Sequence, residues 1–533
     1  LVHTRLSVVD LDGGNQPIED KNYVLIANGE IYNDLEIRKK IKKYSYKSKS
    51  DSESIIAVYS EFGISGFEKL RGMYAFALYD KQKKILILNR DIFGIKPLYF
   101  SIKENGIIFS SEISALKEIN FKNLSISKNK LMETLQLQYS SGKHTIYNGI
   151  QRLRPGELII LEEGRIKRSV IKKLYNENKN PTKISEKYIY DAILESVSTH
   201  LRSDVPYCLF FSGGIDSMLI MYFMNLLKLK NKTTTYKISI EGKNEDRKSF
   251  INEISKDFNV EFNEIFFSKK DFWDLLPFAA KNIDEPIADY AVIPTFKLAS
   301  EASKKFKVAL TGEGGDELFG GYGRYRSKIR LLRRKYFKGA FDNFKSFIKY
   351  DWDFEISQFK YKYPDLTNLQ KFQAFDYENW LPNDLLVKLD RCLMTFGMEG
   401  RTPLIDKELF RKFFYINDRE KINKGFGKYF IRKFLSTRIK KYNSFSKKEG
   451  FTIPIAKWIS EKSKILEQLL PKVEILNEFI KKDDIRTMCK NIEYNKRLAR
   501  PLWNIIFISI WYYMNEKNVN ENGNFFEIIS EYS

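Results

Sequence analysis

Cysteine and histidine are both scarce in this 533-residue chain. The 3 cysteines, Cys208, Cys392 and Cys489, lie far apart and form no C-x-x-C pair, which excludes a disulfide framework and a zinc site built on cysteine pairs. Because only 3 histidines are present, a Ser-His-Asp triad or a histidine-rich metal site would have few residues to draw on. The cysteine pattern therefore predicts a protein of a reducing compartment, the cytoplasm.

Long hydrophobic runs are missing as well. The longest nearly uncharged apolar stretch, 501–514, falls short of the ~18 residues that a membrane-spanning helix needs, and it predicts a buried helix. Positive charge is in excess, with a net charge of +22. The lysines are spread along the chain and no aromatic–basic RNA motif accompanies them, so we interpret the charge as solvated surface. Neither a nucleic acid nor a membrane is expected as a partner.

The first 165 residues are rich in short β-type runs separated by Gly, Asp, Lys and Asn turns. Two helical segments, 34–43 and 51–63, interrupt them, and the combination predicts an α+β sandwich. The predicted strands cover 23–33, 73–80, 84–91, 97–102 and 106–113. Residues 166–187 are polar, rich in Lys and Asn, and contain Pro181, which is typical of a linker between domains.

The pattern changes after residue 188, where short apolar strands alternate with helices. Strands are predicted over 206–211, 234–240 and 260–267, and helices over 217–229 and 248–258. This alternation favours a doubly wound parallel sheet. Beyond about residue 325 the chain is predicted to be mainly helical, which completes a second domain over 188–533.

The motif SGGIDS (212–217) lies between a predicted buried strand and a predicted buried helix. Its glycines let backbone N–H groups approach an anion, and the helix N-terminus adds a favourable dipole. The lysine of a Walker motif is absent, so Mg²⁺ held by Asp216 would have to offset phosphate charge. Such a site suits transfer of AMP to a carboxylate with release of pyrophosphate. Taken alone, the motif is also compatible with a tight structural turn.

A second motif, TGEGGDELFGGY (311–322), also follows a predicted strand. At the carboxyl ends of neighbouring parallel strands the two loops would face one crevice, where ligands bind in such sheets. Asp216 and Asp316 could then share Mg²⁺, which prefers carboxylate oxygens. Glu313, flanked by glycines, is a candidate general base. The alternative interpretation is that such a carboxylate only caps the glycine-rich turn in solvent. The many carboxylates and glycines in this short motif make that interpretation the weaker one.

These motifs, with further segments in family order, resemble the glutamine-hydrolysing asparagine synthetases, whose synthetase domain belongs to the PP-loop ATP pyrophosphatases. The further synthetase segments are 284–295, 388–406, 427–435 and 447–458. The first domain resembles the family's N-terminal-nucleophile glutaminase over 3–17, 28–33, 49–53, 70–80, 89–100, 109–116 and 144–157. The resemblance covers nearly the whole chain.

The resemblance implies that ATP adenylates the aspartate side chain and that ammonia attacks β-aspartyl-AMP to give asparagine. By match, Glu313 takes a proton from ammonia, and Lys448 neutralises pyrophosphate charge, although Lys448 alone could equally be a surface charge. Arg401, Glu399 and Asp406 are interpreted as structural ion pairs. The remaining implied roles are adenosine contacts for Phe211 and Ile238, phosphate contacts for Ser212, Gly213, Gly214 and Ser217, nucleotide contacts for Thr311 and Gly312, and Mg²⁺ ligation by Asp216 and Asp316.

In the first domain the resemblance implies glutamine hydrolysis by an N-terminal thiol, with ammonia passing inside the protein to the second site. The Asn28 side chain and the Gly29 N–H would form the oxyanion hole, Arg5 would bind the glutamine carboxylate, and Glu30 and Asp51 would bind its ammonium. NGE alone is also typical of a hairpin turn. All cysteines lie in the second domain. We therefore expect a truncated chain that lacks its nucleophile and uses free ammonia.

Other functions stay open at this point. Relatives with the same two domains amidate uronic acids of surface polysaccharides or other carboxylates, and only the acceptor would differ. A non-catalytic protein that uses the glutaminase fold as a binding module is a further alternative, against which the intact Asn28, Gly29, Asp216, Glu313 and Asp316 speak. The oligomeric state is open, and a homodimer is one arrangement compatible with the sequence.

Overall fold

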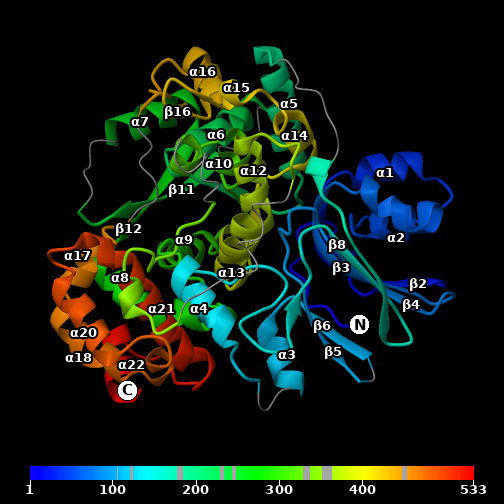
Figure 1. The fold of residues 1–533 in the computed structure, drawn as a ribbon. Coiled ribbons are helices and arrows are strands. Elements are labelled where there is room, and N and C mark those ends of the chain that lie inside the picture. The colour runs from blue at the N-terminus through cyan, green and yellow to red at the C-terminus, as the bar shows by residue number, and fades with distance from the viewer. Residues whose placement is uncertain are drawn as a thin grey trace.

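The computed structural model describes residues 1–104, 106–120, 124–176, 184–227, 233–242, 248–327, 336–350, 363–446 and 453–532. The N-terminal part, blue to cyan in Figure 1, lies on one side of the molecule, and the later part, green to red, lies on the other. Helices α12 (Asn368–Phe375) and α13 (Leu386–Met394) run between the two.

The N-terminal part contains two antiparallel sheets. The larger has the order β1-β2-β3-β4-β8-β9, and the smaller has the order β6-β5-β7. Ala75, Ala77 and Leu88 of the large sheet pack with Leu98 and Phe100, which lie in or beside the small one. The strands are β1 (Ile18–Glu19), β2 (Tyr23–Ile31), β3 (Gly72–Asp80), β4 (Ile85–Arg90), β5 (Tyr99–Lys103), β6 (Gly106–Ser110), β7 (Gln151–Arg152), β8 (Glu157–Glu162) and β9 (Arg165–Ile171). The predicted strands are confirmed.

Helices α1 (Asp34–Lys40) and α2 (Glu53–Phe62) contribute apolar side chains to the other face of the large sheet, among them Ile37, Ile55 and Ile56. The range predicted as a linker, 166–187, begins inside β9, which pairs with β8 from Arg165 to Ile171. The polar composition that indicated a linker is compatible with this strand because an edge strand is held by backbone hydrogen bonds while its side chains face solvent. Residues 177–183 of that range lie outside the described residues.

The second part is built on a five-stranded sheet with the order β12-β11-β10-β13-β14, in which all neighbours are parallel. Its strands are β10 (Tyr207–Phe210), β11 (Thr233–Ile240), β12 (Val260–Phe267), β13 (Val308–Leu310) and β14 (Glu399–Arg401). The parallel sheet is as predicted. The chain extends the sheet in one direction from β10 to β12 and then in the other through β13, so the gap between β10 and β13 is its topological switch point.

Helices surround this sheet and fill the C-terminal part. They include α5 (Glu186–His200), α6 (Ile215–Leu226), α7 (Lys248–Asp257), α8 (Lys269–Lys281), α9 (Val292–Ala302), α10 (Gly315–Phe319), α14 (Lys407–Phe413), α15 (Asp418–Lys421), α16 (Tyr429–Arg438), α17 (Ile455–Ser460), α18 (Ser463–Leu469), α19 (Glu474–Asn477), α20 (Lys482–Asn491), α21 (Ala499–Asn515) and α22 (Phe525–Tyr532). Helices α3 (Ile113–Asn120) and α4 (Lys128–Leu137) belong to the N-terminal part, and a π-helix (Asp376–Leu385) joins α12 to α13.

Helix α21 contains the apolar stretch 501–514 and is almost wholly buried, as predicted. The indole N–H groups of Trp503 and Trp511 donate to the carbonyls of Ala288 and Ile283 at 2.7 and 3.0 Å, so the polar tips of these large side chains are satisfied. Within the described residues, none of the helices combines the length and apolarity needed to cross a membrane.

Buried ion pairs join the two parts. Arg71 makes a bidentate contact with Asp406, its Nε and Nη2 donating at 2.8 and 3.0 Å. Lys96 Nζ lies 2.9 Å from Asp390 Oδ1. The apolar core is also continuous, since side chains such as Phe93 and Phe410 belong to one cluster.

Candidate active site

The two glycine-rich motifs meet at the switch point of the parallel sheet. SGGIDS follows β10, and TGEGGDELFGGY follows the adjacent β13. The backbones approach so closely that a Cβ added to Gly315 would lie 2.1 Å from Asp216 Oδ1, and one added to Gly312 would lie 2.9 Å from Asp216 Cβ. The predicted juxtaposition of the two loops is therefore present.

The SGG turn presents an open helix N-terminus. Gly213 has φ 73°, a left-handed conformation that favours glycine, and Gly214 is the N-cap of α6 without a capping side chain. Ser212 Oγ accepts from Gly214 N at 3.3 Å and lies 3.2 Å from Ser217 Oγ. The first N–H groups of a 12-residue helix, together with two hydroxyls, are thus gathered where an anion is favoured.

Lys428 bridges the two aspartates that were predicted to share Mg²⁺. Its Nζ lies 2.5 Å from Asp216 Oδ2 and 2.8 Å from Asp316 Oδ1, and its side chain is only 3% exposed. Burial alone would lower the pKa of Lys428, but the two carboxylates raise it above the usual lysine value. The ammonium is therefore charged at neutral pH and holds the two carboxylates together from the N-cap position of α16.

The residues predicted to contact the nucleotide base lie on adjacent strands. Phe211 follows β10, and its N–H donates to the Tyr236 carbonyl on β11 at 2.9 Å. Ile238 lies further along β11, and both side chains are buried. Thr311 N donates to the Arg401 carbonyl at 2.9 Å, whereas Thr311 Oγ1 is buried without a hydrogen-bond partner in the described part of the chain. A buried orphan hydroxyl next to the SGG turn fits a polar ligand.

Glu313 faces a buried charged cluster on α13 and the π-helix. Lys388 Nζ lies 3.9 Å from Glu313 Oε1 and 2.8 Å from Asp289 Oδ2. Burial, reinforced by the charge of Asp289, raises the pKa of Asp384 well above its usual value, and Gln138 Nε2 donates to Asp384 Oδ2 at 2.8 Å. Glu313 is itself partly exposed, so it is the member of this group that solvent and ligands reach.

The segment Asn28–Gly29–Glu30 lies within β2, which pairs with β3 from Tyr23 to Ile31. The interpretation of NGE as a hairpin turn is therefore wrong, because the strand continues through it. Gly29 has φ 130°, and a Cβ there would lie 1.9 Å from the Met73 carbonyl oxygen, so this position requires glycine. Asn28 Nδ2 donates to Ser111 Oγ at 3.4 Å.

Glu30 and Asp51 form a buried acidic pair next to Asn28–Gly29. Asp51 Oδ2 accepts from Ile31 N at 2.5 Å. Burial raises the pKa of Asp51 to about 6, and burial together with Asp51 raises the pKa of Glu30 well above its usual value. Arg401, from the second part of the chain, lies beside them, with Nη2 3.3 Å from Glu30 Oε1. The acidic pair thus has a cationic neighbour from the second part of the chain and lies at the boundary between the two parts.

Comparison with known proteins gives the family. Residues 189–513 match the family described as asparagine synthase, and residues 1–175 match the glutamine amidotransferase domain family. The chain belongs to the asparagine synthase family. Glutamine-hydrolyzing asparagine synthetase 1 of Bacillus subtilis (strain 168) is 29% identical over 570 residues, covering 96% of this chain and 89% of that protein.

Two other relatives of this asparagine synthase family member carry similar names. A putative glutamine-hydrolyzing asparagine synthetase of Mycobacterium bovis is 28% identical over 591 residues, covering 95% of this chain and 88% of the relative. The putative glutamine-hydrolyzing asparagine synthetase 2 of Methanocaldococcus jannaschii is 32% identical over 360 residues, covering 62% and 68% respectively.

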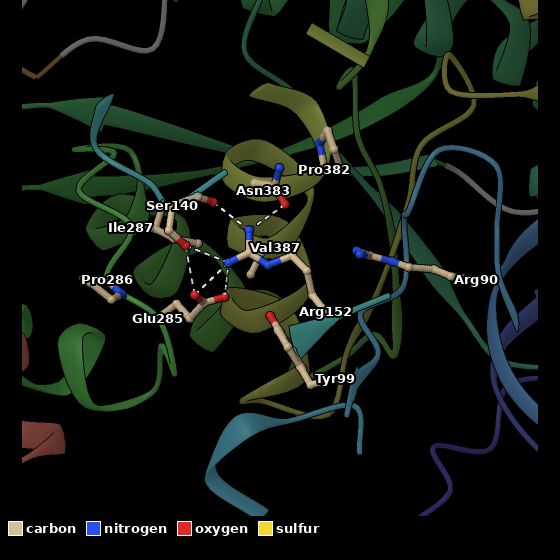
Figure 2. A pocket seen from close by; sticks show the side chains of 10 residues that line it. All are labelled: Arg90, Tyr99, Ser140, Arg152, Glu285, Pro286, Ile287, Pro382, Asn383 and Val387. Atoms are coloured by element: carbon tan, nitrogen blue, oxygen red, sulfur yellow. Dashed lines mark hydrogen bonds and ion pairs between the residues drawn. The ribbon is translucent and has the colours of Figure 1, made fainter. Parts of the chain in front are cut away.

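Two motif segments that were not assigned a role by sequence, one from each domain, also meet in the structure. Arg152 of the segment 144–157 makes a two-oxygen contact with Glu285 of the segment 284–295, at 2.6 and 2.7 Å, and donates to Asn383 Oδ1 at 2.9 Å (Figure 2). Arg152, Glu285 and Asn383 line a small cavity together with Arg90 and Tyr99, and its volume is about 10 Å³. A space of this size holds about one water molecule. These motif residues thus join the two parts of the chain.

The remaining predicted residues have different outcomes. Arg5 Nη2 donates to the carbonyls of Val9 and Asp10, both at 2.7 Å, so the structure places it in its own loop rather than against Glu30 or Asp51. Lys448 lies outside the described residues. The ion pairs are confirmed: Arg401 Nε donates to Glu399 Oε1 at 2.8 Å, and Asp406 pairs with Arg71.

Proposed function

We propose that this chain catalyses the ATP-dependent amidation of aspartate to asparagine through β-aspartyl-AMP, with glutamine or ammonia as the nitrogen donor. The observation that carries the proposal is the pair of carboxylates, Asp216 and Asp316, held by Lys428 between two glycine-rich loops at the switch point of a parallel sheet. The matching relatives carry the names of glutamine-hydrolyzing asparagine synthetases, which supports aspartate as the acceptor.

ATP would lie with its phosphates over the turn at Ser212, Gly213, Gly214 and Ser217 and its adenosine between Phe211 and Ile238. Thr311 and Gly312 close the opposite side of the phosphate chain. The open N-terminus of α6 attracts the phosphates, and the glycines allow the close approach. The aspartate side-chain oxygen attacks the α-phosphorus, forming β-aspartyl-AMP as the bond to pyrophosphate breaks.

Asp216 and Asp316 fit a Mg²⁺ ion because it prefers carboxylate oxygens. In the described residues no larger group of acidic, histidine or cysteine side chains gathers to hold a metal, so phosphate oxygens and water would complete the coordination. When bound, Mg²⁺ neutralises charge on the departing pyrophosphate. Lys428, and Lys448 from the segment 447–458, would supply the remaining positive charge.

Glu313 acts in the second half-reaction. Ammonia attacks the activated carbonyl, AMP leaves, and the Glu313 carboxylate accepts the proton that the new C–N bond makes acidic. Lys388 would favour the ionised form of Glu313 across 3.9 Å, and its own partner Asp289 keeps that lysine in place. A partly exposed carboxylate backed by a buried cation is suited to this role.

The N-terminal part would hydrolyse glutamine as an N-terminal-nucleophile glutaminase when a nucleophilic thiol is supplied. Asn28 and Gly29 N–H would stabilise the oxyanion, Glu30 and Asp51 would hold the glutamine ammonium, and Arg5 would reach its carboxylate after leaving its present loop. Because β9 (Arg165–Ile171) pairs with β8 and α5 begins at Glu186, we extend the first domain from the predicted 165 to 171 and begin the synthetase domain at 186, which leaves 172–185 as the connection. We propose a cytoplasmic location and leave a homodimer as the assembly to test.

Glutamine binding is expected to weaken as the pH falls below 6. Burial and the charge of Glu399 raise the pKa of Asp51 to about 6, against the opposing effects of Arg401 and of the backbone N–H groups of Ile31 and Ser52. An ammonium binds the ionised carboxylate, so the Kd for glutamine should rise by up to about tenfold per pH unit as Asp51 becomes protonated below pH 6. Calorimetric titration between pH 5 and 8 measures this, and a flat profile would remove Asp51 from the site.

The acceptor is tested with the full chain, ATP, Mg²⁺ and ammonium. With aspartate, we expect pyrophosphate, AMP and asparagine in equal amounts, measured by mass spectrometry. With glucuronate in place of aspartate, we expect only the background rate. Pyrophosphate release that needs glucuronate and ignores aspartate would instead identify a sugar-acid amidotransferase.

A further inference from the structure

Arg401 contacts both candidate sites. Its guanidinium lies 3.3 Å from Glu30 and donates to Glu399 at 2.8 Å, while its main-chain carbonyl accepts from Thr311 N at 2.9 Å. The side chain is completely buried. One residue therefore joins the carboxylate assigned to the glutamine ammonium to the first residue of the loop assigned to the nucleotide.

The path between the two contacts is short and rigid. Arg401 is the last residue of β14, where it pairs with Leu310 of β13, and Thr311 follows Leu310 directly. The guanidinium is further fixed by Nη1, which donates to the carbonyls of His200, at 3.0 Å, and Arg202. A displacement of this side chain would therefore be transmitted to the end of β14 rather than absorbed by a flexible segment.

The charges of the cluster give glutamine a means of displacing Arg401. Glu30, Asp51 and Glu399 lie around the Arg401 guanidinium, and a second guanidinium, that of Arg202, pairs with Asp34 and also interacts with Glu30. The α-ammonium of glutamine, bound to Glu30 and Asp51, would compete with Arg401 for Glu30. Arg401 would then rely on Glu399 of its own strand. Because a guanidinium presents its donors in a fixed plane, changing partners requires it to move as a unit.

We infer that Arg401 is a positioning residue that couples occupancy of the glutamine site to the geometry of the nucleotide loop at Thr311. This inference rests on the proposed function, which assigns glutamine to Glu30 and the nucleotide to Thr311. Coupling between two binding equilibria is reciprocal, so each ligand must change the affinity of the other by the same factor.

The test is a calorimetric measurement on the full chain with glutamine and a non-hydrolysable ATP analogue with Mg²⁺. We expect the analogue to change the Kd of glutamine by at least about fivefold, and glutamine to change the Kd of the analogue by the same factor. In Arg401→Lys the single ammonium cannot hold Glu30, Glu399 and the His200 carbonyl together, so the factor should fall towards one while both ligands still bind.

Two further variants test whether any change in coupling is specific to Arg401. Arg71→Lys alters another buried arginine between the two parts, which pairs with Asp406 and contacts neither site, and it should leave the coupling factor unchanged. Glu399→Gln removes the charge of the alternative partner of Arg401 while keeping the side-chain shape, and it should reduce the coupling factor. If Arg401→Lys does not fold, the coupling factor of Glu399→Gln tests the inference in its place.

The outcomes separate the inference from the function on which it rests. Binding of both ligands to the wild-type chain with a factor within about twofold of one overturns the coupling and leaves the proposed function standing. An unchanged coupling factor in both Arg401→Lys and Glu399→Gln would mean that residues other than Arg401 couple the two sites, and it would also overturn the inference. Failure of the wild-type chain to bind either ligand overturns the proposed function, and the inference with it.

Discussion

Asp216→Ala is expected to abolish ATP-dependent release of pyrophosphate. The substitution removes one of the two carboxylates that meet at Lys428 and leaves that buried ammonium with Asp316 alone. Both the predicted metal ligand and the alignment of the two loops are lost, because Asp216 also fills the space against Gly312 and Gly315. A coupled pyrophosphate assay with aspartate and ammonium should show a fall of at least about 10³-fold, comparable to the loss of a main electrostatic contact in other enzymes.

The matched control is Asp191→Ala on α5. Asp191 pairs with Lys187 on the helix surface, and its side chain is 54% exposed, so its loss should leave pyrophosphate release unchanged. Thermal unfolding of both variants distinguishes loss of chemistry from loss of folding. Normal pyrophosphate release by a folded Asp216→Ala variant would refute the assignment of the nucleotide site to these two loops.

Glu313→Gln is expected to separate the two half-reactions. The amide cannot accept a proton, so amide formation should fall by at least about 10²-fold, while adenylation of aspartate, which does not require this base, continues. ATP–pyrophosphate exchange reports adenylation, and isotope-labelled ammonium incorporated into asparagine reports the second step. Equal losses in both assays would show that Glu313 serves binding rather than proton transfer.

Glu317→Gln is the control for this variant. Glu317 lies in the same motif, but burial raises its pKa to about 8, and it accepts a hydrogen bond from Tyr322 at 2.7 Å. The neutral acid and the amide are similar in shape and charge, so this substitution should change neither half-reaction at neutral pH. A large effect would mean that the ionised form of Glu317, rather than of Glu313, takes part.

The loops of the proposed nucleotide site could be predicted from sequence because each is a local pattern. A strand, two glycines and a helix are contiguous at Asp216, and again at Asp316, and parallel strands bring such ends to one edge. Lys428 could not be found in this way. It lies 212 residues from Asp216 in sequence, and the packing of the N-terminus of α16 brings its ammonium to the carboxylates. Its place in the segment 427–435 was the available signal.

The proposed glutamine site was less predictable for a related reason. NGE has the composition of a turn, but the pairing of β2 with β3 carries the strand through Gly29. Tertiary pairing thus overrides the local preference. The neighbour of Glu30 on the other side, Arg401, comes from the synthetase part and has no local relation to it. Contacts between distant segments are set by packing, which the spacing of residues along the sequence does not predict.

The continuous core and the buried ion pairs between the two parts have a consequence for folding. Separating the parts at the connection would expose the apolar cluster to which Phe93 and Phe410 belong. It would also leave Arg71 without its partner Asp406 and Lys96 without its partner Asp390. A buried charge that loses its partner costs several kcal/mol, on the order of the whole stability of a domain. The two catalytic parts therefore form one cooperative unit, which should melt in a single calorimetric transition.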